Sequence, residues 1–243
     1  MKSIIYQGKL KYIDSQRMKE LHNKNTNLIK DIIIGMSDGL TVPFALTAGL
    51  SGVLDTNHLI IVSGFAEITA GCISMGLGGF LAGQSEIEHY DSELHREYSE
   101  VESVPLVELK EVEDIFMNMG VDEKLSKQVA LQVSKDKNHW VDLMMKLELM
   151  MEKPAKNRAA ISAGTIALAY LAGGFIPLFP YIVTNNSNTG FKISCIVTIL
   201  ALIIFGFFKS KMTGQPLLKG TIKVALTGII AAGAAFLLAK AVS

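Results

Sequence analysis

The sequence predicts an all-α polytopic membrane protein with five transmembrane helices and a cytosolic domain of three to four helices inserted between the second and third. Two observations support this fold class. Almost half of the 243 residues are apolar, and they lie in long uninterrupted runs instead of the one-sided pattern of soluble amphipathic helices. Patterns typical of strands are essentially absent, and no internal repeat is visible.

Three of the predicted spans are long apolar segments. Residues 159–183 contain no charged residue, and a helix of this length is sufficient to cross a hydrocarbon core of about 30 Å. Residues 32–54 and 59–82 are equally apolar, except that each contains one carboxylate. Residues 193–208 and 224–239 are shorter, and we expect the lysines at their ends to extend to the membrane surface. The sequence therefore predicts five spans.

The charge distribution predicts the topology. Residues 1–30 contain seven Lys or Arg against two acidic residues, whereas residues 86–114 contain eleven acidic residues against two basic ones. A basic arm stays in the cytosol by the positive-inside rule, and alternation then returns the acidic segment to the cytosol. The predicted organisation is a basic cytosolic N-terminal arm (1–30), two spans (31–85), an acidic cytosolic domain (86–157) and three spans (158–243).

Local patterns predict helices within the acidic domain. Pro105 suits the first turn of a helix that stops at Gly120, and Asp122 can cap the next helix. Residues 136–153 are periodic until Pro154 ends the helix. Because no helix breaker follows the second span, we expect that span to continue unbroken into the domain.

The carboxylates of the first two spans are Asp38 and Glu67. A carboxylate within a span is costly, so both are candidates for a functional site, with a structural hydrogen bond between helices as the alternative. Pro43 cannot donate a backbone hydrogen bond and leaves the carbonyl of Gly39 without its helical partner. A carbonyl next to a carboxylate would form a cation-binding notch at membrane depth, where irregular backbone is tolerated if it lines a cavity.

A second feature of the span 59–82 is its face of small residues. Glu67, Gly71, Ser74 and Gly78 share one helical face, which would allow another helix to approach closely. Met75 flanks this face about 12 Å from Glu67 along the helix axis. Its thioether is there either a softer ligand for a passing ion or an ordinary packed side chain. Carboxylates in apolar surroundings take up protons readily, so exchange of metal for protons is the expected coupling.

Acidic side chains also form stripes in the predicted cytosolic domain. Glu93, Glu97 and Glu100 fall on one face of the extended helix, and Glu108 and Glu111 fall together on the next helix. Such a stripe repels itself unless cations neutralise it. The alternative is a solvated acidic face.

The last helix of this domain carries thioethers beside a carboxylate. Met144, Glu148 and Met151 line one face, with Met145 adjacent. Oxygen ligands suit hard cations and thioethers suit soft ones, so a mixed site favours a borderline ion such as Fe²⁺ over Ca²⁺ or Mg²⁺. The alternative is an apolar core that contains methionine.

Two other interpretations use the same residues. Glu86 and His89 have the Glu-x-x-His spacing of ferritin-like di-iron bundles, which would suit a membrane-tethered di-iron oxidase. The spacing occurs once, with a loose echo at Asp136 and His139, whereas a di-iron centre needs the pair. A metal-sensing membrane protein is the other alternative, although an anchor has no use for intramembrane carboxylates.

The segments Ser37–Phe44 (Ser-Asp-Gly-Leu-Thr-Val-Pro-Phe), Ala66–Ile68 (Ala-Glu-Ile) and Ser74–Gly79 (Ser-Met-Gly-Leu-Gly-Gly) resemble the vacuolar iron transporter family. The resemblance covers most of residues 31–243. It implies a homodimeric transporter, not an enzyme, that moves Fe²⁺ from the cytosol into a vacuole-like store in exchange for protons, for iron storage and detoxification. Iron is then the substrate and not a cofactor, with Mn²⁺ or another divalent transition metal as a further substrate.

The resemblance also implies roles for particular residues. Asp38, Glu67 and Met75 would line the transport pathway at the dimer interface. The metal-binding set of the cytosolic domain would be Glu97, Glu100, Glu108, Glu111, Met144, Met145 and Glu148. The expected partners are a second copy of the chain, metal ions, protons and membrane lipid, with no nucleic acid. The expected location is the vacuolar membrane, with the endoplasmic reticulum as an alternative, and with the N-terminus and acidic domain in the cytosol.

Overall fold

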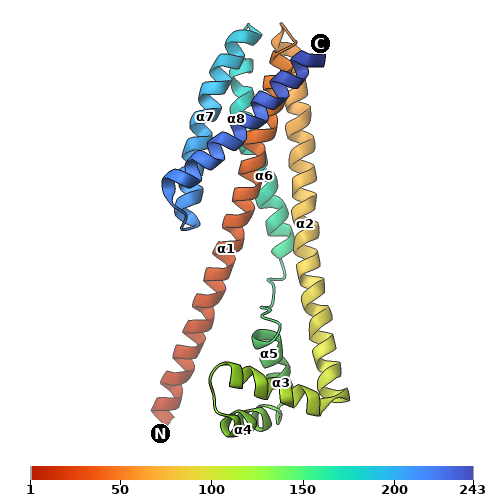
Figure 1. The fold of residues 1–243 in the computed structure, drawn as a ribbon, viewed down its shortest axis with the longest axis vertical. Coiled ribbons are helices and arrows are strands. Elements are labelled where there is room, and N and C mark those ends of the chain that lie inside the picture. Colours follow the sequence, from red (N-terminus) through yellow and green to blue (C-terminus); the bar gives the residue numbers. More distant parts are fainter. Residues whose placement is uncertain (1, 243) are drawn as a thin grey trace. The chain divides into compact units, whose positions relative to one another are not determined.

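The structure is a computed structural model that describes the backbone of residues 2–242 and the side chains of residues 27–242. The side chains of most of the basic arm therefore lie outside the described residues. This part of the chain contains eight α-helices and no strand (Figure 1). The helices are α1 (Lys2–Ser51), α2 (Asn57–Ser103), α3 (Pro105–Asn118), α4 (Glu123–Val133), α5 (Lys137–Leu147), α6 (Arg158–Val183), α7 (Ser187–Met212) and α8 (Leu217–Val242).

Five helices are long and apolar enough to cross a membrane, in agreement with the sequence: α1 from Asn27 onward, α2, α6, α7 and α8. The predicted bounds of the last two spans were too narrow, because α7 and α8 each contain 26 residues. Asn186 starts α7 before its apolar part, accepting hydrogen bonds from the backbone N–H groups of Asn188 at 2.9 Å and Thr189 at 3.3 Å. Such a cap lets polar residues begin a helix that the hydropathy pattern alone does not include.

The prediction that the second span continues without a break into the following segment is confirmed. α2 is one helix of 47 residues, about 70 Å at 1.5 Å per residue, which is more than twice the thickness of a hydrocarbon core. The chain divides into two compact units, one of residues 1–80 and 160–243, and one of residues 81–159. We call residues 1–80 and 160–243 the membrane unit, because they contain the apolar parts of the five long helices. α2 contributes its first half to the membrane unit and its second half to the unit of residues 81–159.

In the membrane unit, α6 lies between α1 and the first half of α2 (Figure 1). Its neighbours present glycines to it: a Cβ added to Gly35 of α1 or to Gly79 of α2 would meet Ile166 of α6. Small residues at such positions let helix backbones approach closely, which is the main source of packing energy between helices in lipid. α1 also packs against α7 and α8 on its other side.

In the second unit, α3, α4 and α5 pack with the end of α2 around an apolar core. α3 begins at Pro105 and is followed by Gly120 at φ +91°, and Asp122 caps α4 by accepting from the backbone N–H of Leu125 at 3.1 Å. These three features agree with the sequence. The core contains Tyr90, Val101, Val112, Ala130, Trp140, Val141, Met144 and Met145.

The predicted helix over residues 136–153 was too long. α5 ends at Leu147, where the Met144 carbonyl accepts from the backbone N–H groups of both Glu148 and Leu149. Met150 then takes a positive φ of 51°. The backbone thus turns out of the helix while the apolar periodicity continues, because the following side chains still pack on the same core.

Candidate functional site

The intramembrane part of the candidate site begins at a close crossing of α1 and α6. A Cβ added to Gly39 would collide with the backbone of Tyr170, and one added to Gly173 would meet the backbone of Gly39 and Leu40 at 3.0 Å. The crossing therefore requires glycine on both helices. It brings the Tyr170 side chain within electrostatic range of Asp38.

The Tyr170 side chain connects this crossing to α2. Its hydroxyl donates a hydrogen bond to Oε1 of Glu67. The ring occupies the space that Gly71 leaves open, since a Cβ at that position would overlap the ring. The second carboxylate oxygen of Glu67, Oε2, is buried and has no hydrogen-bond partner among the described residues. A buried carboxylate oxygen without a donor is costly, so this atom is available to a cation or a proton.

The other predicted intramembrane residues lie on the open side of the same helices. Asp38 is exposed and Met75 is half-buried. Ser74 is exposed, and nothing lies within 4 Å of a Cβ added to Gly78. The small-residue face predicted for α2 thus divides: Gly71 packs against α6, whereas no helix of the described residues packs against Ser74 and Gly78.

Tyr170 was missed by the sequence reasoning. It lies in the predicted span without charges, where a tyrosine is typical of ordinary aromatic packing. The available signal was its polar hydroxyl near the middle of an apolar segment, because a buried tyrosine hydroxyl usually has a partner.

The second part of the candidate site is the carboxylate cluster of residues 81–159. Glu97 of α2 is 1% exposed and Glu108 of α3 is 3% exposed, and Oε2 of each has no hydrogen-bond partner among the described residues. Glu108 and Glu148 lie within electrostatic range of each other and of the three other predicted carboxylates, Glu97, Glu100 and Glu111. The structure therefore brings together the acidic members of the predicted metal-binding set.

This crowding affects proton binding. Burial, followed by repulsion from Glu111, raises the pKa of Glu108 to about 7. Burial, followed by repulsion from Glu111 and Glu97, raises the pKa of Glu148 to about 7 as well. Glu108 and Glu148 are therefore partly protonated near neutral pH, and a cation that binds between the carboxylates displaces protons.

Arg96 partly neutralises the cluster and was also missed by the sequence reasoning. Its Nη2 lies 2.8 Å from Oε2 of Glu93 and 3.4 Å from Oε1 of Glu97, and its Nε lies 3.6 Å from Oε2 of Glu100. The spacing of three and four residues along α2 was the available signal. We expected the acidic stripe of α2 to repel itself unless cations neutralise it, and Arg96 of the same helix supplies one such cation.

The predicted thioethers lie in the apolar core of this unit. Met144 and Met145 are 0% and 1% exposed and pack with Val112 and Trp140. Glu148 is the C-terminal cap residue of α5 and follows Met144 by four residues. In the described part of the chain, no three His, Cys, Asp or Glu side chains are arranged so that they would hold one metal ion.

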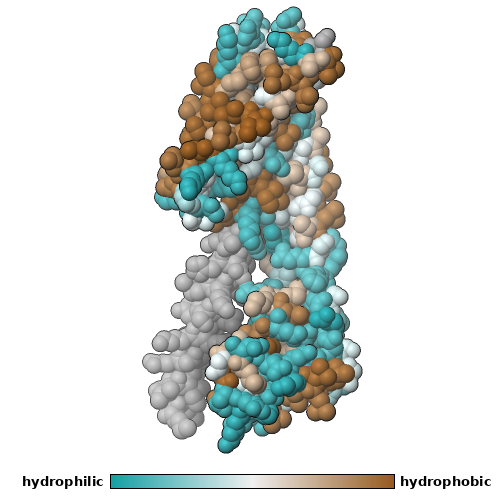
Figure 2. All heavy atoms as spheres, in the orientation of Figure 1, coloured by the Kyte–Doolittle hydropathy of each residue, from teal (hydrophilic) through white to brown (hydrophobic). Residues whose placement is uncertain are grey.

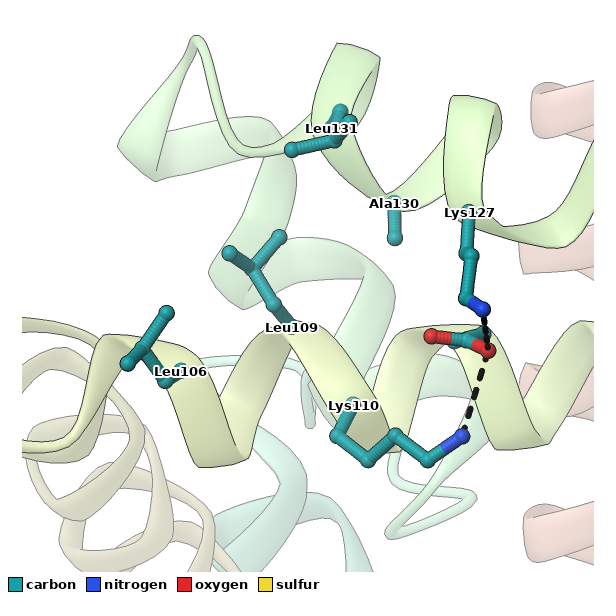
Figure 3. Close-up of a pocket in the computed structure, with 7 residues that line it drawn as sticks. Leu106, Leu109, Lys110, Lys127, Ala130 and Leu131 are labelled. Carbon is teal, nitrogen blue, oxygen red and sulfur yellow. Dashed lines mark hydrogen bonds and ion pairs between the residues drawn. The ribbon is translucent and has the colours of Figure 1, made fainter.

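Glu113 shows a different environment on the neighbouring face of α3. It is buried, and its Oε1 lies 3.1 Å from Nζ of Lys110 and 3.9 Å from Nζ of Lys127. Figure 3 shows both lysines reaching this carboxylate at the edge of a pocket between α3 and α4. Lys110 and Lys127 therefore neutralise Glu113, whereas Oε2 of Glu108, five residues earlier, has no hydrogen-bond partner among the described residues.

The Glu-x-x-His segments do not form a paired centre in the described residues. The side chains of His89 and His139 are 66% and 80% exposed. Each interacts with a carboxylate of its own segment: His89 with Glu93 at 3.9 Å and His139 with Asp136 at 2.8 Å. Ligands of a di-iron bundle project into the interior, so these histidines lack the arrangement that an oxidase needs.

Comparisons with known proteins identify relatives over almost the whole chain. The model of the VIT family matches residues 29–240. Vacuolar iron transporter 1 of Tulipa gesneriana is 46% identical over 227 residues, which cover 93% of this chain and 92% of the tulip protein. Vacuolar iron transporter 1 of Arabidopsis thaliana is 45% identical over 92% of this chain and 89% of that protein. Protein CCC1 of Saccharomyces cerevisiae is 38% identical over 88% of this chain and 68% of the yeast protein. The chain belongs to the VIT family.

Proposed function

We propose that this chain is a multi-pass transporter that moves Fe²⁺ from the cytosol into a vacuole. The observation that carries the proposal is the arrangement of Asp38, Tyr170 and Glu67 within helices of membrane-spanning length, with one Glu67 oxygen lacking any partner in the described chain. A polar group of this kind is costly in lipid and marks an ion or proton route. The relatives named vacuolar iron transporters support iron as the substrate.

The proposed route uses the two carboxylate sites for different tasks. The cluster around Glu108 collects the ion in the cytosol, and Met75, Glu67 and Asp38 carry it across the membrane. Protons return in exchange, because a carboxylate in apolar surroundings such as Glu67 takes up a proton once no cation is bound to it. Mn²⁺, which accepts the same oxygen ligands, is proposed as a second substrate.

We further propose that two copies of the chain enclose the route. Asp38, Ser74 and Gly78 lie on the open side of α1 and α2. A charged side chain that faces lipid is unfavourable, and the spacing of Ser74 and Gly78 suits close approach of a second helix. A second copy of the same surface would remove Asp38 from lipid and complete a polar passage.

The test is Fe²⁺ uptake into proteoliposomes that contain the full chain, with a metal-sensitive dye and a pH-sensitive dye inside the vesicles. Glu67→Gln should abolish both metal uptake and the accompanying pH change, because the amide cannot exchange a proton for a cation. Glu123→Gln, which alters an exposed carboxylate of α4 paired with Lys127, is the matched control and should transport normally. Undiminished uptake by Glu67→Gln would refute the route, and uptake without a pH change would refute the proton exchange alone.

A further inference from the structure

Met150 combines two unfavourable features just after the end of α5. Its φ of 51° lies in the left-handed region, and among the residues that the structure describes it is the only one other than glycine with a positive φ. A side chain in this conformation crowds the following carbonyl oxygen, which is why glycine is the usual residue there. The Met150 side chain is also 83% exposed, so packing gives little in return.

Two other helix ends of the same chain have glycine in the left-handed conformation. Gly120 at φ +91° follows the C-terminal cap of α3, and Gly214 at φ +67° follows that of α7. After α5, the Met145 carbonyl accepts from the backbone N–H of Met151 at 2.8 Å, and the left-handed residue directly precedes Met151. Glycine would form this turn with less strain. The turn itself therefore does not explain a methionine at position 150.

Exposure by itself would not make Met150 unusual. Figure 2 shows a largely hydrophilic surface over residues 81–159, with smaller hydrophobic patches, and single exposed apolar side chains are ordinary in soluble domains. Met119, for example, is 59% exposed and has a helical φ of −78°. Met150 is both exposed and strained, and such an outlier points to a function of the side chain.

Met150 lies next to the carboxylate cluster, since it follows Glu148 by two residues. Their Cα atoms are at most about 7 Å apart, and a methionine side chain is long, unbranched and adaptable. The Met150 sulfur can therefore reach the carboxyl group of Glu148, which is itself exposed. Met144 and Met145 are 0% and 1% exposed, so their sulfur atoms would have to leave the core to meet an ion in solvent.

A thioether adds a kind of ligand that the carboxylates do not provide. Burial, followed by repulsion from Glu111 and Glu97, raises the pKa of Glu148, so a further carboxylate would increase the repulsion. A thioether is neutral, needs no deprotonation before it binds a metal, and is softer than a carboxylate. It favours a borderline ion such as Fe²⁺ more than Mn²⁺, which suits carboxylate and carbonyl oxygens.

We propose that Met150 is an additional metal ligand of the carboxylate cluster, where its thioether binds the ion together with the Glu148 carboxylate and favours Fe²⁺ over Mn²⁺. This inference rests on the proposed collection of the ion at the cluster, and it adds a residue that sets the preference between ions. Because Met150 and Glu148 are exposed while Glu97 and Glu108 are buried, an ion from solvent contacts the first pair before the second.

The experiment measures binding of Fe²⁺ and of Mn²⁺ to the full chain in detergent by anaerobic calorimetry at pH 8. Met150→Leu keeps an apolar side chain of similar size and removes the sulfur. Affinity for Fe²⁺ should fall about fivefold, while affinity for Mn²⁺ should change less than about twofold. Met119→Leu removes an exposed thioether at the end of α3, and this matched control should change neither. Equal losses for both ions, or unchanged Fe²⁺ affinity in Met150→Leu, would overturn the proposal.

Met150→Gly separates metal binding from folding. Relief of the left-handed strain offsets the greater freedom of glycine in the unfolded chain. The metal-free variant should therefore melt no lower than the wild type, while its Fe²⁺ affinity falls as in Met150→Leu. A clearly lower melting temperature would mean that the Met150 side chain serves the fold, and the inference from strain would be wrong.

A direct readout of contact uses Zn²⁺, which is diamagnetic, and full-length protein with isotope-labelled methionine methyl groups. Zn²⁺ should shift the methyl resonance of Met150, identified by its loss in Met150→Leu, and should leave that of Met119 in place. An unshifted Met150 resonance in the Zn²⁺-bound protein would contradict ligation. A wild-type chain that binds no Fe²⁺ would refute collection at the cluster and this inference with it, whereas binding that does not depend on Met150 would refute this inference alone.

Discussion

In the membrane unit, the carboxyl group of Glu67 meets a neutral tyrosine hydroxyl, whereas in residues 81–159 the carboxylates around Glu108 meet one another and the guanidinium of Arg96. Each site retains at least one buried carboxylate oxygen that has no hydrogen-bond partner among the described residues. They differ in how charge is distributed. In the membrane unit, helix packing holds the single acid Glu67, whereas several acids of the cluster share the guanidinium of Arg96. Our proposal assigns passage of the ion to the first arrangement and its collection to the second.

The largest expected effect comes from the helix crossing that forms the membrane site. Gly39→Val should reduce Fe²⁺ uptake to background, because a side chain at that position collides with the backbone of Tyr170 and separates α1 from α6. Overpacking of this kind costs about 1–3 kcal/mol, and the melting temperature in detergent should fall. Gly233→Val of α8 is the matched control for folding, since nothing lies within 4 Å of a Cβ added there. Normal uptake by Gly39→Val would show that the crossing does not position the site.

The second prediction concerns pH and applies to the cytosolic cluster alone. Metal binding requires deprotonated carboxylates, and the pKa values of Glu108 and Glu148 are raised to about 7. The affinity of the full chain for Fe²⁺ should therefore fall between about tenfold and a hundredfold from pH 8 to pH 6. Anaerobic calorimetry in two buffers that differ in ionisation enthalpy should also detect released protons. A flat profile would place the ion away from these two groups.

Glu108→Gln tests whether the buried carboxylate is a binding group maintained at a cost to stability. Fe²⁺ affinity at pH 8 should fall at least about tenfold, by loss of a charged ligand. The metal-free protein should melt at a higher temperature than the wild type at pH 8. The folded pKa of Glu108 lies above its unfolded value, so the ionised group destabilises the fold fully above about pH 7 and not at all below pH 4.

The stabilisation by Glu108→Gln should accordingly shrink between pH 8 and pH 5. Glu113→Gln is the informative contrast, because Lys110 and Lys127 already neutralise that carboxylate. It should destabilise the protein slightly and leave metal affinity unchanged. A lower melting temperature for Glu108→Gln at pH 8 would mean that the carboxylate has a stabilising partner in the folded protein.

Particular residues show why the sequence predicts the helices better than the sites. Pro105 and Asp122 act within their own helix turns, so their effects can be read from neighbouring residues. The partnership of Tyr170 and Glu67 joins residues far apart in the chain, and it depends on space left by Gly71, which the sequence assigned only to a general small-residue face. Hydropathy marks an acid in a span as unusual but gives no comparable signal for a tyrosine.

The end of α5 illustrates a second limit. The apolar pattern continues past Leu147, and Met151 still packs on the core although the helix has ended. Periodicity reports which residues reach the core and not which backbone carries them there. Met144 and Met145 are ambiguous for the same reason, since a buried thioether that serves the core and one that faces an ion have the same sequence pattern.

Tyr170→Phe sharpens the description of the membrane site with a smaller effect. The variant removes the hydroxyl that donates to Glu67 and keeps the ring that fills the space beside Gly71. The initial rate of Fe²⁺ uptake should fall about tenfold, in line with loss of one hydrogen bond to a charged group. Tyr181→Phe, in the same helix and bonded to Ser51 at 2.8 Å, is the control and should transport at nearly the wild-type rate per folded molecule. Equal losses in both variants would indicate general weakening of α6.

Arg96→Gln has the smallest expected effect and bears most directly on the comparison. Arg96 is half-exposed, and ion pairs of that kind each contribute roughly 0.2–1 kcal/mol. If the guanidinium occupies carboxylates that the metal needs, its removal should raise Fe²⁺ affinity a few-fold and steepen the dependence of binding on salt. Lys135→Gln removes an exposed ammonium that donates to Gln132 at 2.9 Å on the same unit; it changes the net charge equally and should have no such effect. Weaker binding in Arg96→Gln would instead make Arg96 a residue that orders the carboxylates, and the cluster would then resemble the membrane site in depending on a fixed hydrogen-bond donor.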